Sequence, residues 1–171
     1  MSRKNKCSNN YEKTKLKINR AYKKERNVRK DFIEKFTTQL ADKFKTVVIE
    51  DLKLQKMTKS TKGTIENPGK NVKVRSSINR EMLRLGFGTF RKRLIDKQKA
   101  RNHNVILVNP RFTSQICSNC GHQDENNRRS QSKFRCTNCG FEINADYNAA
   151  INIRERGIKV LNGGTELGKV A

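Results

Sequence analysis

Two pairs of cysteines constrain this chain more than any other feature, because four thiolates around one ion impose a local fold. Cys117 and Cys120 make the first pair, and Cys136 and Cys139 make the second. Two residues separate the members of each pair, and fifteen residues lie between the pairs. This spacing is typical of zinc sites in which each pair grips one side of a tetrahedral ion. The sequence therefore predicts Zn²⁺ held by four sulfur ligands.

The residues beside these cysteines indicate a structural site. Gly121 and Gly140 each follow the second cysteine of a pair, where a tight turn requires left-handed backbone. Four thiolates leave no coordination position for water or substrate. His122 is interpreted as a bystander, and Cys7 as a lone thiol without a partner motif. Two disulfides are the alternative, which a reducing compartment disfavours.

The charge of the chain indicates a polyanionic partner. Lys and Arg total 39 of 171 residues against 16 Asp and Glu, which gives a net charge of +23. Such an excess favours nucleic acid or an acidic membrane surface. The sequence has no run of about 18 apolar residues, so no membrane span is expected. Its charged start lacks the apolar stretch of a secretory signal, and we expect a cytoplasmic protein.

The first part of the sequence predicts a long helix followed by a strand. Residues 1–62 contain neither Gly nor Pro, and residues 1–45 are expected to form a basic amphipathic helix. Its apolar residues Val28, Phe32, Phe36 and Leu40 recur at a spacing of four, with Ile33 beside them. The β-branched run at 47–49 predicts a buried strand that leads into Glu50. Residues 53–75 are expected to form a flexible loop, since Gly and Pro interrupt a polar stretch.

The second part predicts one more strand and two more helices. A helix over 78–94 is expected to be interrupted at 86–88, where the sequence is GFG. The sequence NVILVNP predicts a buried strand that Pro110 ends. A last helix is expected to begin near Asn144, and residues 157–171 to form a loose tail. This order predicts an α/β layer, and because two strands do not make a stable sheet, further strands are expected.

Two acids stand at the ends of predicted elements. Glu50 ends the first buried strand, and Asp146 lies at the start of the last helix. They could share a metal site. Alternatively, Asp146 could simply favour the positive N-terminus of its helix, and Glu50 could be an edge acid paired with a lysine.

Four stretches, in this order, resemble the transposon-encoded TnpB (OrfB) family of RNA-guided nucleases. They are SRKNKCSNNYEKTKLKI, VVIEDLKLQKM, NPRFTSQICSNCG and FRCTNCGFEINADYNAAINI, and the resemblance runs from about residue 2 to about residue 156. It implies a transposase-associated DNA endonuclease, active in DNA recombination and transposition, with a guide RNA as partner. It also implies a RuvC nuclease domain of RNase H-like fold, with a zinc ribbon inserted before its last catalytic segment.

The resemblance assigns roles to both acids and divides the chain. Glu50 matches the second catalytic acid of the family and Asp146 the third, and the pair would bind catalytic Mg²⁺, which prefers oxygen ligands. The implied parts are a basic helix (1–45), a partial RuvC core (46–111), a zinc ribbon (112–142), the last catalytic helix (143–156) and a flexible tail (157–171).

Seven residues are predicted to contact nucleic acid. Arg91, Lys92 and Arg93 begin the basic stretch RKRLIDKQKAR, which suits phosphate contacts. Arg111 and the run Thr113, Ser114 and Gln115 follow the second strand and are expected to help seat the nucleic acid.

The sequence departs from the family at its start. The first catalytic Asp of the family lies in a GIDLG-like strand upstream of the basic helix, and no such stretch occurs here. We therefore expect a truncated frame, lacking the first strands of the sheet and inactive alone, or one piece of a split gene whose N-terminal half is a separate chain. The alternatives are a non-catalytic zinc-ribbon module that binds nucleic acid, and a half protein whose open sheet edge recruits strands from another chain.

Overall fold

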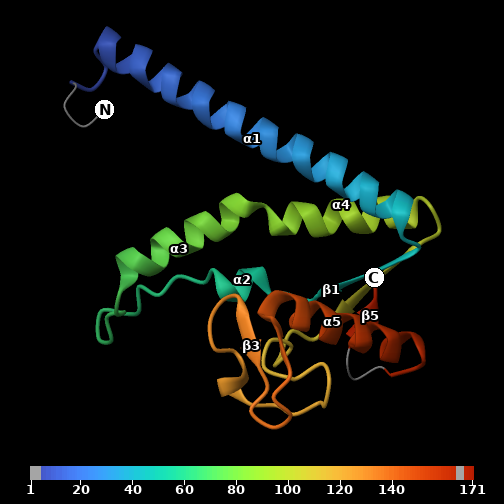
Figure 1. Ribbon diagram of the computed structural model, residues 1–171. Coiled ribbons are helices and arrows are strands. Elements are labelled where there is room, and N and C mark those ends of the chain that lie inside the picture. The colour runs from blue at the N-terminus through green and yellow to red at the C-terminus, as the bar shows by residue number, and fades with distance from the viewer. Residues whose placement is uncertain (1–4, 165–167) are drawn as a thin grey trace. The chain divides into compact units, whose positions relative to one another are not determined.

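The structure is a computed structural model that describes residues 5–164 and 168–171. It is a mixed α/β chain that divides into two compact units. Of the described residues, unit 1 contains those up to 40 and residues 58–94, and unit 2 contains residues 41–57 and those from 95 onward. Two helices pass from one unit into the other: α1 (Asn9–Lys43) and α4 (Phe87–Lys99) (Figure 1). Over the described ranges, no helix combines the length and the apolarity that a membrane crossing requires.

Unit 1 is helical, and its buried seam differs from the predicted one. Ile33, which was predicted beside the stripe, is buried together with Thr37 of α1, whereas Val28 and Phe32 of the stripe are 62% exposed. Position 37 lies one turn beyond 33, so the buried line is offset by one residue from the predicted line. The predicted aromatics instead form a surface stack, in which the Phe36 ring lies 5.7 Å from that of Phe32 and 5.9 Å from that of Phe90.

The predicted interruption of the second helix is confirmed at Gly86. Helix α3 (Val72–Leu85) ends there, and α4 begins at the next residue. Gly86 has a left-handed backbone (φ 76°) and donates its N–H to the Leu83 carbonyl at 3.3 Å. A residue with a Cβ would be strained in this conformation, so the glycine ends one helix and lets the next begin.

The predicted loop at 53–75 is shorter than expected and contains a built turn. Helix α2 (Leu54–Met57) occupies its start in unit 2, and α3 takes its last residues in unit 1. Between them, Gly69 donates its N–H to the Lys62 carbonyl at 2.8 Å, and Thr64 donates to the Asn67 carbonyl at 3.0 Å. These bonds close a tight turn, which explains why Gly and Pro gather in this part of the sequence.

Unit 2 contains a three-stranded sheet in the order β1, β2, β5. β1 (Thr46–Glu50) pairs in parallel with β2 (Asn104–Val108), and Glu50 lies opposite Val108. Both strands form where they were predicted, but only β2 is buried as expected, whereas β1 is half-buried along its whole length. α5 (Ala145–Leu161) packs on this sheet (Figure 1) and approaches it closely at Gly157, where an added Cβ would lie 2.4 Å from Cγ2 of Val48.

The predicted loose tail is wrong in two respects. α5 continues to Leu161, and β5 (Gly168–Val170) adds an antiparallel strand to β2. Residues 165–167 of the predicted tail lie outside the described residues. β5 fits because Gly168 has no side chain: an added Cβ would lie 2.2 Å from the Leu107 carbonyl oxygen. The cysteine segment forms a second, two-stranded sheet from β3 (Lys133–Arg135) and β4 (Glu142–Asn144), preceded by the short helix η1 (Glu125–Asn127).

Candidate metal centre and carboxylate site

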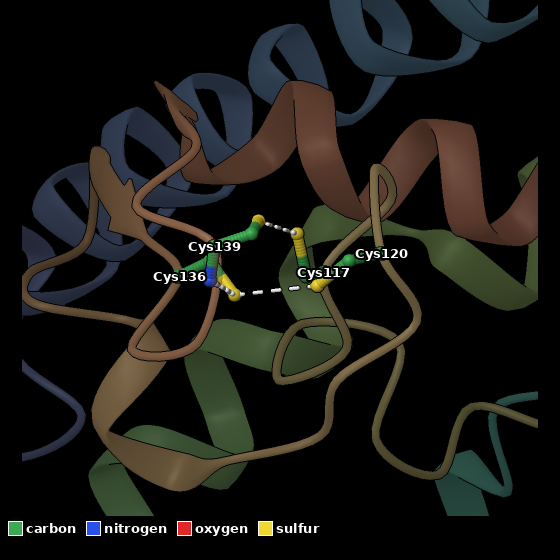
Figure 2. Close-up of side chains that lie close together, drawn as sticks. All are labelled: Cys117, Cys120, Cys136 and Cys139. Atoms are coloured by element: carbon green, nitrogen blue, oxygen red, sulfur yellow. Dashed lines mark hydrogen bonds between the residues drawn. The ribbon is translucent and has the colours of Figure 1, made fainter.

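The four cysteine sulfurs lie together, as Figure 2 shows. All four Sγ atoms lie within 4.8 Å of one another, with 3.8 Å between Cys117 and Cys139 and 3.6 Å between Cys120 and Cys136. A tetrahedral ion with Zn–S bonds of about 2.3 Å requires S···S separations of roughly 3.8 Å. All four cysteines are free thiols. The cluster could therefore bind a metal such as zinc.

Two matching turns present the sulfurs. Gly121 donates its N–H to the Cys117 carbonyl at 2.9 Å, and Gly140 donates to the Cys136 carbonyl at 3.1 Å. Both glycines have a left-handed backbone, with φ of 76° and 72°, as the sequence predicted. No neighbouring atom lies within 4 Å of a Cβ built at either position, so the requirement for glycine is conformational.

The thiols differ in their environment. Burial raises the pKa of the Cys117 thiol to about 12. A backbone hydrogen bond from Phe141 lowers the pKa of the Cys139 thiol to about 6. Cys117 and Cys136 also belong to a small apolar core with Phe134 and Ala145. This segment therefore combines its own packed core with one sulfur cluster, and a bound metal would hold all four sulfurs as thiolates.

Two asparagines attach the first cysteine turn to α5. Asn148 is fully buried; it accepts from the Ser118 N–H at 3.0 Å and donates to the Ile116 carbonyl at 2.8 Å. Asn152 donates to the same carbonyl at 2.7 Å and to that of Thr113 at 2.9 Å. Sequence reasoning missed both residues. The available signal was two asparagines four residues apart on a helix, a spacing that places them on one face.

Glu50 lies at the carboxyl end of β1 and is half-buried. Thr113, which is 5% exposed, donates its hydroxyl to Glu50 Oε1 at 2.7 Å. The preceding turn holds this threonine in place: Phe112 has a left-handed backbone (φ 62°), and the Arg111 N–H donates to Asn109 Oδ1 at 3.0 Å. The structure thus places Thr113 against the acid.

Arg156 of α5 is a second neighbour of Glu50 that sequence reasoning missed. Its Nη1 donates to the Asn109 carbonyl, beside the same turn. Burial lowers the pKa of the Arg156 guanidinium, and the negative charge of Glu50 opposes that shift. The carboxylate of Glu50 therefore has a hydroxyl donor and a cation in its surroundings.

Asp146 lies in the first turn of α5 and is 78% exposed at its side chain. Asn144 caps this helix: its side chain accepts from the Asp146 N–H at 2.9 Å and from the Tyr147 N–H at 3.2 Å. The Asp146 carboxylate is paired with Arg128, whose Nη2 lies 3.1 Å from Oδ1. Asn144 supplies the cap, and the place of Asp146 in the first turn agrees with the alternative that this acid favours the positive N-terminus of its helix.

The other residues predicted to contact nucleic acid differ in how accessible they are. Lys92 and Arg111 are exposed, and the Arg111 guanidinium lies 5.5 Å from the centre of the Phe112 ring. Arg91 is half-buried, as are Ser114 and Gln115. Arg93 is engaged by Glu34, which accepts from both its Nε and its Nη2.

Two family models match the chain. One is described as "Cas12f1-like, TNB domain" and matches residues 87–153, and the other is described as "Probable transposase" and matches residues 1–61. The Escherichia coli protein InsQ, whose name contains the words RNA-guided DNA endonuclease, is 46% identical over 94% of this chain and 40% of its own length. A TnpB-like protein of Methanocaldococcus jannaschii is 34% identical over 87% of this chain and 32% of its own length.

A solved structure agrees with these matches. The cryo-EM structure of a Cas12f1–sgRNA–target DNA complex aligns with a TM-score of 0.57 and 28% identity, over 82% of this chain and 37% of that one. The chain thus spans about two fifths or less of the relatives it matches. The family models, the relatives and the shared fold all agree with the resemblance in the sequence, and the chain belongs to the TnpB-type family.

Proposed function

We propose that this chain is the nuclease-side part of a TnpB-type RNA-guided DNA endonuclease, with a partial RuvC (RNase H-like) core and a zinc ribbon. Glu50 and Asp146 are two of the three acids of its Mg²⁺ site, and DNA and a guide RNA are its partners. The chain is inactive alone, because two carboxylates hold a pair of Mg²⁺ ions poorly. Among the described residues β1 is an edge strand of the order β1, β2, β5, and further strands of a RuvC sheet would pair there.

The placement of Glu50 is the observation that carries this proposal. Ligand sites of α/β sheets lie beyond the carboxyl ends of parallel strands, where Glu50 stands. Thr113 fixes its Oε1 through the 2.7 Å hydrogen bond, which leaves Oε2 for a cation. A surface acid paired with a lysine would not require a buried threonine as its partner.

The chain's own residues would orient the chemistry. Mg²⁺ bound at these acids would supply charge neutralisation at a scissile phosphate and a hydroxide nucleophile. Glu50 is oriented by Thr113, and Arg156 is a cation in its surroundings. To bind a metal ion, Asp146 would have to release Arg128, and its exposed position would permit this. The four cysteines would hold Zn²⁺ and fix the start of α5 through Asn148.

Paramagnetic Mn²⁺, titrated into the ¹⁵N-labelled chain, tests whether the two acids share a cation. We expect the amide signals of 49–51 and 145–147 to broaden over the same Mn²⁺ range. Glu50→Gln should reduce the broadening at both places, whereas Asp31→Asn, on an exposed acid of α1, should reduce it at neither. Independent titration of the two segments would contradict the proposal.

A second candidate function is a zinc-ribbon module that binds nucleic acid without chemistry. The ion pair between Asp146 and Arg128, on a carboxylate that is largely exposed, favours it. Under this alternative, Glu50→Gln combined with Asp146→Asn leaves Mn²⁺ binding unchanged, and binding to DNA requires no divalent ion. The Mn²⁺ titration therefore separates the two functions.

A further inference from the structure

A cavity of about 800 Å³ lies in unit 1, away from the cysteines and from Glu50. Its walls come from α3, from the segment that precedes α3 and from one residue of α1. Five cations line it: Arg29, Lys62, Lys73, Arg80 and Arg84. Hydroxyl residues stand between them, among them Ser60 and Thr61 on one wall and Ser76 and Ser77 on the other. We call this cavity the α3 groove.

The α3 groove has an excess of positive charge. No acid belongs to its lining. Arg84 is paired with Glu25 at 2.7 Å and with Glu81 at 3.2 Å, and Arg29 and Arg80 share these same two acids. Five cations thus face two acids. Within the described residues, Lys62 and Lys73 have no acidic partner, so their charges are available to a ligand.

The walls are held by hydrogen bonds that do not involve these two lysine side chains. The Asn79 side chain donates to the Thr58 carbonyl at 3.0 Å and to the Lys59 carbonyl at 3.3 Å, which ties the loop to α3. Gly69 closes the turn behind it on the Lys62 carbonyl. The groove is therefore formed before a ligand enters, and this lowers the ordering cost of binding.

The start of α3 adds to the field in the groove. Val72 and Lys73, from its first turn, are part of the lining. The first turn contains no acid, and the N-cap residue Asn71 makes no side-chain capping bond. A lysine beside the positive end of a helix is unfavourable unless an anion lies there. No described residue caps the N–H groups of the first turn through a side chain, and these groups and the Lys73 ammonium both suit an anion.

We propose that the α3 groove binds successive phosphate groups of a single nucleic-acid strand. The choice of nucleic acid rests on the proposed function; the anionic chemistry rests on the groove itself. No aromatic side chain lines the groove, so bases have no stacking platform there. Lysines, arginines and hydroxyls contact phosphate without reading sequence. The volume exceeds that of one phosphate group, so the groove fits a run of backbone and not a single ion.

The test compares two double variants that remove the same charge. Lys62→Gln with Lys73→Gln removes the two unpaired lysines of the groove, and Lys13→Gln with Lys17→Gln removes two exposed lysines of α1. Binding to labelled 20-mers of uridine and of deoxythymidine is followed by fluorescence anisotropy across a salt series. The groove variant should reduce the slope of log K against log[salt] by about 1.4, since each neutralised phosphate of a single strand contributes about 0.7. The α1 variant should retain the original slope.

The remaining outcomes are also decisive. If both variants reduce the salt slope equally, binding depends on diffuse positive charge and not on the groove. If neither variant reduces the slope, the groove does not bind the oligomers. Comparable effects on the two oligomers support phosphate contact, whereas an effect confined to the RNA oligomer would overturn it in favour of 2′-hydroxyl recognition. Inorganic tripolyphosphate should shift the amide signals of Lys73 and Ser76 at low salt. All measurements omit added divalent ions, so they do not depend on metal binding by Glu50 and Asp146. Either proposal can therefore fail while the other stands.

Discussion

At the scale of single residues, one hydroxyl determines how Glu50 is held. Thr113 is nearly fully buried and donates to Oε1 of the acid at 2.7 Å. Thr113→Val keeps the shape of the side chain and removes this donor. We expect it to lower the unfolding free energy by about 1 kcal/mol and to weaken Mn²⁺ broadening at 49–51. Thr113→Ser is the matched control and should preserve both in thermal melts and in the titration. A fully retained Mn²⁺ response in the valine variant would count against a positioning role.

For a second hydroxyl, that of Thr61, we expect the opposite effect on stability. Thr61 Oγ1 is buried without a hydrogen-bond partner among the described residues. Burying an unpaired hydroxyl costs free energy, and valine has the same shape without the polar atom. Thr61→Val should therefore leave the unfolding free energy of the free chain unchanged or raise it by at most about 1 kcal/mol. The melting temperature should accordingly stay the same or rise. A clear drop in the melting temperature would show that this hydroxyl has a partner.

At the scale of elements, α5 connects the sheet with the cysteine segment. Its Gly157 lies against Val48 of β1, and a Cβ there would lie 2.4 Å from Cγ2. Gly157→Ala would favour an isolated helix, yet it should destabilise this protein by about 1–3 kcal/mol through overpacking. Urea unfolding measures the change. Adding Val48→Ala should recover part of the loss, and if the double variant is no better than the single one, the clash is not the cause.

The geometry of the four cysteines predicts the metal content of the protein. Purified chain should contain about one zinc per molecule, bound tetrahedrally by sulfur in X-ray absorption. Cys136→Ser should lose the metal, and the β3–β4 hairpin should then lose its protected amides in hydrogen exchange. The exposed Cys7 gives the matched control, because Cys7→Ser should retain the full zinc content. Undiminished folding of the Cys136 variant under strong chelation would contradict a structural metal.

At the scale of the whole molecule, the net charge of +23 predicts strongly salt-dependent binding to nucleic acid. Counterion release requires log K to fall linearly with log[salt], and several phosphate contacts give a steep slope. Filter binding of single- and double-stranded DNA over a salt series measures it. Affinity that stays constant from low to high salt would remove electrostatics as the basis of recognition.

Local patterns were enough to predict some elements and not others. The cysteine spacing, the β-branched strands and the break at Gly86 each depend on neighbours in the sequence, and all three are observed. β5 has only three residues and no apolar pattern, and it exists because β2 offers it an edge. The pairing of Arg93 with Glu34 joins residues 59 positions apart, so the sequence could not show that this cation is engaged. Buried asparagines were missed because asparagine is more typical of loops and caps.

The contacts of helix α5 have a practical consequence for assays of this chain. Asn148 and Asn152 fasten it to the first cysteine turn, and Gly157 seats it on the strand that ends in Glu50. Loss of the metal during purification would weaken the contacts of α5 with the cysteine turn, and it would disturb Glu50 as well. Because the chain alone is expected not to cut DNA, its zinc stoichiometry should be measured before a weak Mn²⁺ response at Glu50 is taken as evidence about the acids.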